Sequence, residues 1–205
     1  MLKIRSLVQP AGAQGHDRLH IGSWATGSLL AVCDGAGGTS GAAGAAEAVI
    51  QYIGRVAPHA NKSTRALLVD TLHAIDQSPP LASAGLTTAL VAVVADGEIQ
   101  GACVGDSEAW LVSNTDEIML TENQNRKPLV GSGRCSAVPF GPVPMRGTLV
   151  LGSDGLFKYC RRERLLDIVR SPDLELIPEL LLRASRLPSG RLQDDFAVIV
   201  CRDFA

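Results

Sequence analysis

The middle of the chain reads as short strands joined by tight turns, and this pattern restricts the fold more than any other feature of the sequence. Residues 87–95 are mostly aliphatic, Asp96-Gly97 is a strong signal for a hairpin turn, and residues 98–104 supply the returning strand. Further strands are expected at 108–113 and 117–120. Because hairpins join antiparallel neighbours, whereas parallel strands need long crossover connections, the sequence predicts antiparallel sheets.

Helices are expected on both sides of this strand-rich region, which indicates the α+β class. Residues 40–56 are rich in alanine, and residues 62–77 carry leucine and isoleucine at helical spacing. Two more helices are predicted at 162–170 and 173–186, separated at Pro172. The remaining strands are predicted at 2–8, 18–22, 28–33, 148–152 and 196–201. Residues 122–147 are rich in Gly, Pro and polar side chains, which predicts a long loop of the kind that often carries function.

The composition suits a single domain over residues 1–205. Hydrophobic residues make up 46% of the chain, so a sizeable core can form, and the formal net charge is only -2. Without a block of basic residues, binding to nucleic acid is not expected. No apolar run is long enough for a secretory signal or for the ~20 residues of a membrane span, so we expect a cytoplasmic protein with no membrane contact.

The cysteines number five and are widely spaced along the chain. An odd number without close pairs favours buried, reduced thiols over a disulfide framework. A cysteine nucleophile or a zinc site stays open as the alternative.

Aspartates stand at the ends of several predicted strands. Asp34 and Asp154 each follow an aliphatic strand, Asp194 precedes the last strand, and Asp17 precedes the strand at 18–22. In an antiparallel sheet the end of one strand lies beside the start of its neighbour, so these four side chains are expected to meet on one rim.

Such a group of carboxylates needs positive charge, because two carboxylates 4 Å apart repel by about 1 kcal/mol in water and by about 4 kcal/mol at an effective dielectric constant near 20. Ligands that are all oxygen favour Mg²⁺, Mn²⁺ or Ca²⁺ over zinc. The glycines after Asp34 and Asp154 would also leave backbone carbonyls open to a cation. An Asp-Gly pair after one strand is more often a simple turn, but its repetition together with Asp194-Asp195 favours a metal site.

The sequence resembles the PP2C-type, metal-dependent protein serine/threonine phosphatases. Six short motifs occur in that family's order, from about residue 15 to the C-terminus. They are AVCDGAGG at 31–38, GLT at 85–87, ACVGDS at 102–107, LT at 120–121, LVLGSDGL at 149–156 and QDDFAVIV at 193–200.

The resemblance implies a four-layer α-β-β-α sandwich, in which two antiparallel sheets are flanked by pairs of helices. It also implies a site for two divalent cations, Mn²⁺ or Mg²⁺, at one end of the sandwich. By position, Asp34 would bridge both ions, the carbonyl of Gly35 would bind one, and Asp154 and Asp194 would complete the other. Asp106 matches the family's third and weaker metal position.

The activity implied by the resemblance is hydrolysis of phosphoserine and phosphothreonine esters in proteins by a metal-activated water, without a covalent phosphoenzyme. Asp17 matches an acidic residue that holds the metal-bound water. The partners implied are a phosphorylated protein substrate and a cognate serine/threonine kinase, in a signalling role.

The sequence departs from the family pattern at several positions. Gly12 stands where the family has a phosphate-binding arginine, and Arg5 or Arg18 is a candidate replacement, Arg18 being the one we assign to substrate binding. Ala36 replaces the histidine that is a proposed general acid. His16 and Asp195 replace the family's usual glutamate and asparagine, and the segment between Asp106 and Asp154 is shorter than usual.

Two other functions are suggested by parts of the sequence. A dinucleotide-binding enzyme is suggested by Gly35-x-Gly37 after a strand, but Ser40 breaks the G-x-G-x-x-G pattern, and Asp34 would repel a pyrophosphate. A catalytically weak or inactive PP2C-like regulatory or binding module is suggested by the missing arginine and histidine, although the retained aspartates argue against it.

Overall fold

The structure is a computed structural model that describes residues 2–36, 41–56, 65–78, 81 and 84–203. Its strands form two five-stranded antiparallel sheets. The first has the order β1-β10-β9-β6-β7, with β1 at Leu2–Gln9, β10 at Phe196–Asp203, β9 at Thr148–Gly152, β6 at Glu108–Val112 and β7 at Glu117–Met119. The second has the order β2-β3-β4-β5-β8, with β2 at Asp17–Trp24, β3 at Gly27–Asp34, β4 at Ala89–Ala95, β5 at Glu98–Val104 and β8 at Val138–Pro144.

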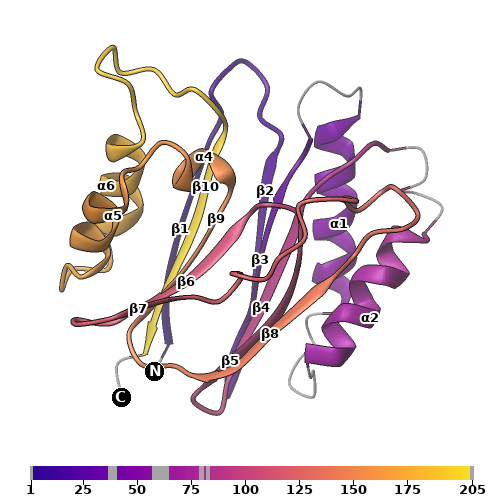
Figure 1. Ribbon diagram of the computed structural model, residues 1–205, viewed down its shortest axis with the longest axis horizontal. Coiled ribbons are helices and arrows are strands. Elements are labelled where there is room, and N and C mark those ends of the chain that lie inside the picture. The colour runs from indigo at the N-terminus through magenta and orange to yellow at the C-terminus, as the bar shows by residue number, and fades with distance from the viewer. Residues whose placement is uncertain (1, 37–40, 57–64, 79–80, 82–83, 204–205) are drawn as a thin grey trace.

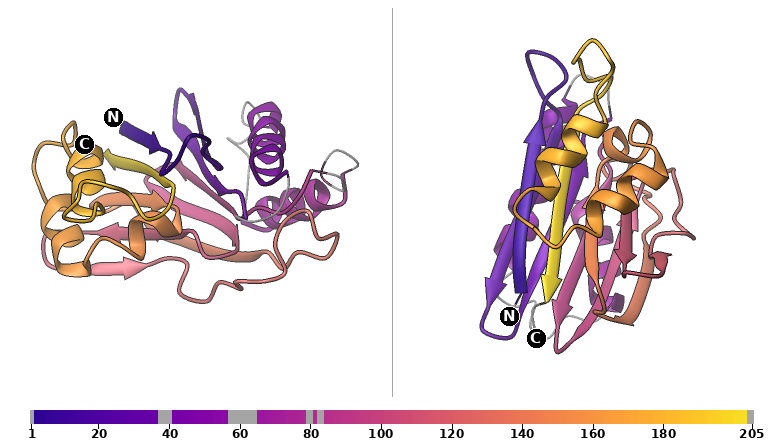
Figure 2. Two further views of the ribbon diagram at one scale, coloured as in Figure 1. Left: turned by 90° about the horizontal axis from the view of Figure 1, so that it is seen from above. Right: turned by 90° about the vertical axis from the view of Figure 1, so that its left-hand side faces the viewer.

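The sheets pack face to face, and helices cover both outer faces (Figures 1 and 2). The second sheet is covered by α1 at Ala42–Val56 and α2 at Arg65–Asp76. The first sheet is covered by α4 at Asp154–Phe157, α5 at Arg162–Val169 and α6 at Ile177–Ala184. The predicted four-layer α-β-β-α sandwich of the α+β class is therefore confirmed.

Strand β3 shows how the sequence produces these layers. Leu29, Ala31 and Cys33 pack against the helix side, while Leu30 and Val32 face the other sheet. Successive side chains on a strand point to opposite faces, so a strand between two apolar layers must be apolar throughout. This explains why residues 28–33 form an unbroken hydrophobic run.

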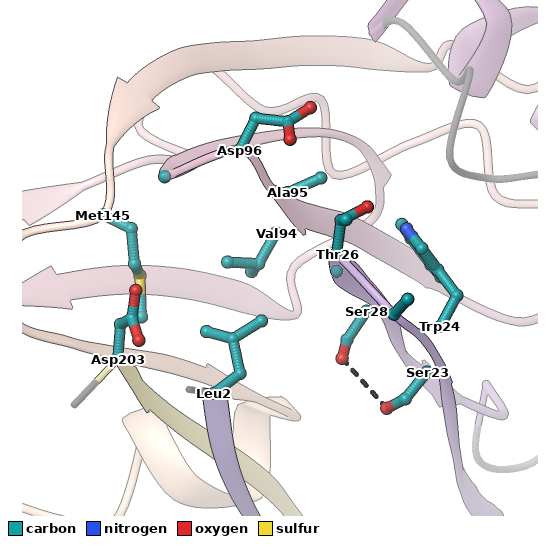
Figure 3. Close-up of a pocket in the computed structure, with 13 residues that line it drawn as sticks. Leu2, Ser23, Trp24, Thr26, Ser28, Val94, Ala95, Asp96, Met145 and Asp203 are labelled. Atoms are coloured by element: carbon teal, nitrogen blue, oxygen red, sulfur yellow. Dashed lines mark hydrogen bonds between the residues drawn. The ribbon is translucent and has the colours of Figure 1, made fainter. Parts of the chain in front are cut away.

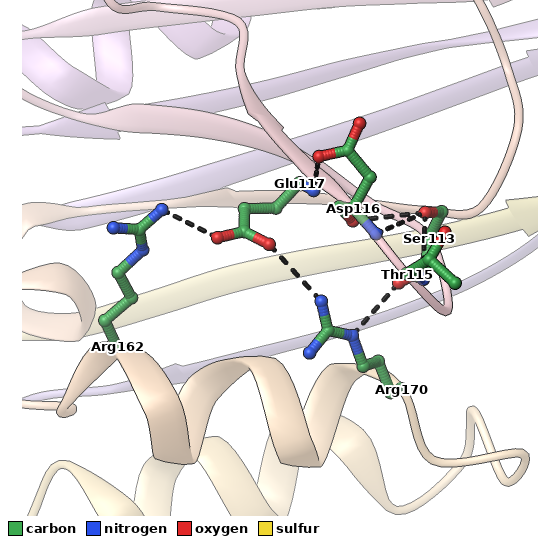
Figure 4. A network of polar contacts seen from close by, with 6 residues as sticks. All are labelled: Ser113, Thr115, Asp116, Glu117, Arg162 and Arg170. Carbon is green, nitrogen blue, oxygen red and sulfur yellow. Dashed lines mark hydrogen bonds and ion pairs between the residues drawn. The ribbon is translucent and has the colours of Figure 1, made fainter.

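Helix α5 is attached to the edge of the first sheet by an ion-pair network (Figure 4). The carboxylate of Glu117 on β7 accepts hydrogen bonds from Arg162 at 2.7 Å and from Arg170 at 3.3 Å. Arg162 also lies over the ring of Trp110, 5.4 Å from its centroid. The network holds α5 against β6 and β7.

The predicted long loop at 122–147 is wrong in its second half, because residues 138–144 form β8 at the edge of the second sheet. Three prolines in this strand hid it, since proline is unfavourable inside a sheet but is tolerated on an edge. The ring of Phe140 lies over Gly101 of β5, where a side chain would leave it no room.

The other boundaries shift by a few residues. Helix α2 is described from Arg65, and the start predicted for it at 62–64 lies outside the described residues, as does part of the start predicted for α1. Helix α6 begins at Ile177 rather than at 173, with Pro178 in its first turn. The short helix α4 was not predicted.

All the cysteines are buried and none forms a disulfide. Burial raises the pKa of Cys103 and Cys201 to about 12. Thiols that stay protonated at neutral pH are poor nucleophiles and poor metal ligands, which agrees with a structural role. Among the described residues, no helix combines the length and the apolar character needed to cross a bilayer.

Candidate metal centre

Asp34 is the last residue of β3, and its position is fixed by hydrogen bonds to Thr88, the residue before β4. The hydroxyl of Thr88 accepts from the backbone N–H of Asp34 at 2.9 Å, and the carbonyl of Asp34 accepts from the N–H of Thr88 at 2.8 Å. Thr88 is linked in turn to Ser107 by a 2.8 Å contact between hydroxyls. The strand end that presents Asp34 is thus held by buried polar side chains.

Asp17 begins β2 and is the register partner of Asp34 on the neighbouring strand. Its side chain is buried, and neither of its carboxylate oxygens has a hydrogen-bond partner among the described residues. Ser153 and Asp34 lie near this carboxyl group, but neither makes a hydrogen bond of normal geometry with it.

Asp154 and Asp194 belong to the first sheet. Asp154 opens α4 directly after β9, and Asp194 precedes β10. The two segments lie very close together, because a Cβ atom at Gly155 would stand only 1.8 Å from the carbonyl oxygen of Asp195. Gly155 is therefore required for the approach of the two aspartate-bearing turns.

Asp34, Asp154 and Asp194 line one pocket of about 690 Å³, at the end of the sandwich remote from both termini (Figure 1), whereas Asp17 is buried beside Asp34 and is not part of the lining. Its acidic lining consists of Asp34, Asp106, Asp154, Asp194 and Asp195, with Gly35 beside them. From the sequence we expected the aspartates on the rim of a single sheet, but they come from both sheets. The packing of one sheet on the other brings Asp34 to Asp154 and Asp194.

The electrostatics of the pocket disfavour carboxylates without counter-charge. Burial, followed by repulsion from Asp17, Asp154 and Asp194, raises the pKa of Asp34 to about 9. Burial, with repulsion from Asp195 and Asp154, raises the pKa of Asp17 to about 7. Burial and the neighbouring Asp154 also raise the pKa of Asp194. Divalent cations would reverse these effects by stabilising the ionised forms.

The donor set fits hard cations, since it consists of carboxylate and carbonyl oxygens. Within the described part of the chain, no three His, Cys, Asp or Glu side chains have the arrangement of a preformed metal site. The acidic groups line the pocket instead of converging on one point, which is what their mutual repulsion favours.

Asp195 anchors the loop between β1 and β2. Its two carboxylate oxygens accept hydrogen bonds from the backbone N–H groups of Ala11 at 2.8 Å and His16 at 2.6 Å. The ring of His16 lines the pocket, with Nδ1 3.7 Å from Asp195. The acidic residue at this position therefore has a structural partner, which the sequence did not reveal.

Neither candidate arginine lies in the pocket lining. The guanidinium group of Arg18 donates to the carboxylate of Glu47 at 2.9 Å and to the carbonyls of Gly15 and Asp17. Arg5 forms an ion pair with Glu175 instead. The structure thus gives no support to the substrate-binding role that we assigned to Arg18.

The pocket contains three basic side chains that sequence reasoning missed: Arg126, Lys127 and Lys158. Lys158 could have been found, because it stands four residues after Asp154 and shares its helix face. Arg126 and Lys127 could not, since their segment is held by long-range hydrogen bonds of Asn125 with Gly105 and of Val130 with Thr87.

A second pocket, of about 300 Å³, lies at the opposite end of the sandwich, where β2 turns into β3 and β4 turns into β5 (Figure 3). Its two carboxylates are Asp96, in the turn between β4 and β5, and Asp203, at the end of β10, and much of the rest of the lining consists of small or apolar side chains. The concentration of aspartates is a property of the first pocket.

Solved structures of similar fold include bacterial phosphatases. Stp1 from Staphylococcus aureus shares 18% identity with a TM-score of 0.86, covering 100% of this chain and 96% of that one. The S. agalactiae serine/threonine phosphatase shares 16% identity with a TM-score of 0.82, covering 98% and 99%. The catalytic domain of PstP, solved in complex with two manganese ions, shares 18% with a TM-score of 0.80, covering 98% and 97%. At this identity the likeness shows the fold alone.

A search of curated proteins found no match. The sequence itself provides the remaining comparison, since residues 9–128 match the family model described as protein phosphatase 2C. That span is more than half of the chain and includes Asp17, Asp34 and Asp106. Together with the shared sandwich, it shows that the chain belongs to the protein phosphatase 2C family.

Proposed function

We propose that this chain is a metal-dependent protein serine/threonine phosphatase that acts with two Mn²⁺ or Mg²⁺ ions, and that residues 1–205 work as one domain. One observation carries the proposal. Aspartates from both sheets gather at a single pocket, and the pKa values of Asp34 and Asp194, which line it, and of Asp17, which lies beside Asp34, are raised. A cluster of this kind costs stability unless cations bind to it.

Asp34, the carbonyl of Gly35, Asp154 and Asp194 are the groups that would hold the two ions, because all of them line the pocket. When bound, the ions would activate water near neutral pH and offset the charge on the phosphoryl oxygens. Asp106 also lines the pocket, at the family's third and weaker metal position.

Asp17 would direct the attacking water. Its buried carboxylate lies next to Asp34, outside the pocket lining, and accepts no hydrogen bond from the described residues, so it could accept one from a water held beside Asp34. Attack by that water forms one P–O bond while the bond to the serine or threonine oxygen breaks. No protein side chain is needed as nucleophile, which agrees with the buried, protonated cysteines.

Arg126 is our candidate for binding the substrate phosphate in place of the arginine that Gly12 replaces. Its side chain is exposed at the pocket and forms no hydrogen bond or ion pair with the described residues, although Glu108 is near enough to be affected by its charge. A guanidinium group can bind phosphate oxygens in two-fold fashion. Its exposed position suits binding of a phosphorylated segment of a protein substrate.

We also predict a cognate kinase and a cytoplasmic signalling role.

Hydrolysis of phosphoserine and phosphothreonine peptides by the purified protein, with Mn²⁺, Mg²⁺ or EDTA, tests the proposal. We expect turnover with either metal and none with EDTA. Asp34→Asn and Asp194→Asn should each lower kcat/KM by ~100-fold or more, because each removes a metal-binding group. Asp96→Asn, in the pocket of Figure 3, is the matched control and should change little.

The second candidate function is an inactive regulatory or binding module. The absence of the family's arginine at Gly12 favours it. Gly12 is exposed, and no atom of the described residues lies within 4 Å of the place where a Cβ would be, so no steric constraint requires glycine there. This candidate would be preferred if Mn²⁺ and Mg²⁺ gave no turnover with any phosphopeptide and Asp34→Asn changed nothing.

A further inference from the structure

Lys158 is placed at the acidic pocket by the geometry of a short helix. It follows Asp154 by four residues, and its backbone N–H donates to the carbonyl of Asp154 at 2.8 Å. Residues four apart in a helix lie on one face. The ammonium group accordingly forms an ion pair with Oδ2 of Asp154 and lines the pocket.

The ammonium group shares this pocket with other carboxylates. Asp106 and Asp194 belong to the same lining as Asp154 and Lys158. Half of the Lys158 side chain is exposed, and ion pairs at such positions contribute little to folding stability. We therefore expect Lys158 to affect the charge inside the pocket more than the stability of the fold.

We propose that the ammonium group of Lys158, paired with Asp154, takes the place of a third divalent ion in the pocket that Asp106 also lines, so that the site holds two metal ions and one fixed organic cation. The inference rests on the proposed function, since it concerns the same site. A third divalent ion in this pocket would be repelled by the ammonium group of Lys158, because like charges in a partly buried pocket repel more strongly than in water.

The test counts Mn²⁺ ions per chain by equilibrium dialysis and by electron paramagnetic resonance of free Mn²⁺. We expect two ions for the unchanged protein and for Lys158→Arg, which keeps the charge. Lys158→Met should bind a third, weaker ion, and the ion at Asp154 should bind roughly tenfold more tightly once the competing charge is gone. Lys158→Met combined with Asp106→Asn should return to two.

Lys127→Met is the matched control, because Lys127 lines the same pocket and has no hydrogen bond or ion pair with the described residues. It should leave both the number of ions and their affinities unchanged. Three ions in the unchanged protein, or unchanged binding in Lys158→Met, would overturn the inference and leave the proposed function standing. Absence of Mn²⁺ binding to the unchanged protein would overturn both.

Discussion

Asp17 and Asp34 are register partners on adjacent antiparallel strands, and their carboxyl groups lie together in a largely buried position. Strand β2 begins where β3 ends, so the pairing itself places two acids side by side. The fold thus creates a local excess of negative charge at the pocket, and several consequences of that charge can be measured.

The first concerns the stability of the metal-free protein. Burial raises the pKa of Asp17 to about 7 and that of Asp34 to about 9, from an ordinary value of 3.8. Between pH 4 and 9, the folded state holds protons that the unfolded state has released, so the free energy of unfolding must fall as pH rises through this range. Urea unfolding in EDTA should give a lower free energy of unfolding at pH 8.5 than at pH 5.5.

Asp17→Asn provides the control for this effect. The amide does not ionise, so the variant should lose part of the pH dependence and be more stable than the unchanged protein at pH 8.5 in EDTA. A metal-free protein that gained stability across the same range would contradict the electrostatic account of the pocket.

The second prediction concerns metal binding to the folded state. A ligand that binds only the folded protein raises its melting temperature, and Mn²⁺ needs the ionised carboxylates. We expect Mn²⁺ to raise the melting temperature more at pH 8 than at pH 5.5, as measured by differential scanning fluorimetry. Asp194→Asn should reduce the shift, whereas Asp96→Asn, at the other end of the sandwich, should not.

Much of this site could be predicted from sequence because its parts are local. An aliphatic strand that ends in Asp-Gly identifies Asp34 and Asp154 within a few residues, and the order of the motifs identifies the sandwich. The parts that failed depend on distant pairing. Strand β8 was hidden by its prolines, and the segment that carries Arg126 is held by distant partners, since the carbonyl of Asn125 accepts from the N–H of Gly105 and Val130 pairs with Thr87.

The third prediction concerns Arg126. Hydrogen bonds to charged groups are worth about 1.5–3 kcal/mol, so Arg126→Ala should lower kcat/KM for a phosphopeptide by ~10- to 100-fold, mainly through KM. The number of Mn²⁺ ions bound should stay the same. Arg134→Ala is the control, since Arg134 is exposed in the same segment but does not line the pocket. Equal effects of the two substitutions would point to general charge attraction rather than to a binding site.

The last prediction concerns how the segment that carries Arg126 is held. Asp76, at the end of α2, is buried, and its carboxylate accepts hydrogen bonds from the backbone N–H groups of Gly131 at 2.6 Å, Gly133 at 3.1 Å and Cys135 at 2.8 Å. These bonds fix the chain between Arg126 and β8 against the helix layer.

Asp76→Ala would leave three backbone donors without their acceptor, and we expect it to lower the free energy of unfolding by about 3 kcal/mol or more. Asp70→Ala, at an exposed position on the same helix, should change stability by less than about 0.5 kcal/mol. If Asp76 also positions Arg126, its variant should raise KM for a phosphopeptide at temperatures where it is still folded, while Mn²⁺ binding is kept. A loss of stability with an unchanged KM would show that Arg126 is positioned without Asp76, because the two measurements report separate consequences of one set of hydrogen bonds.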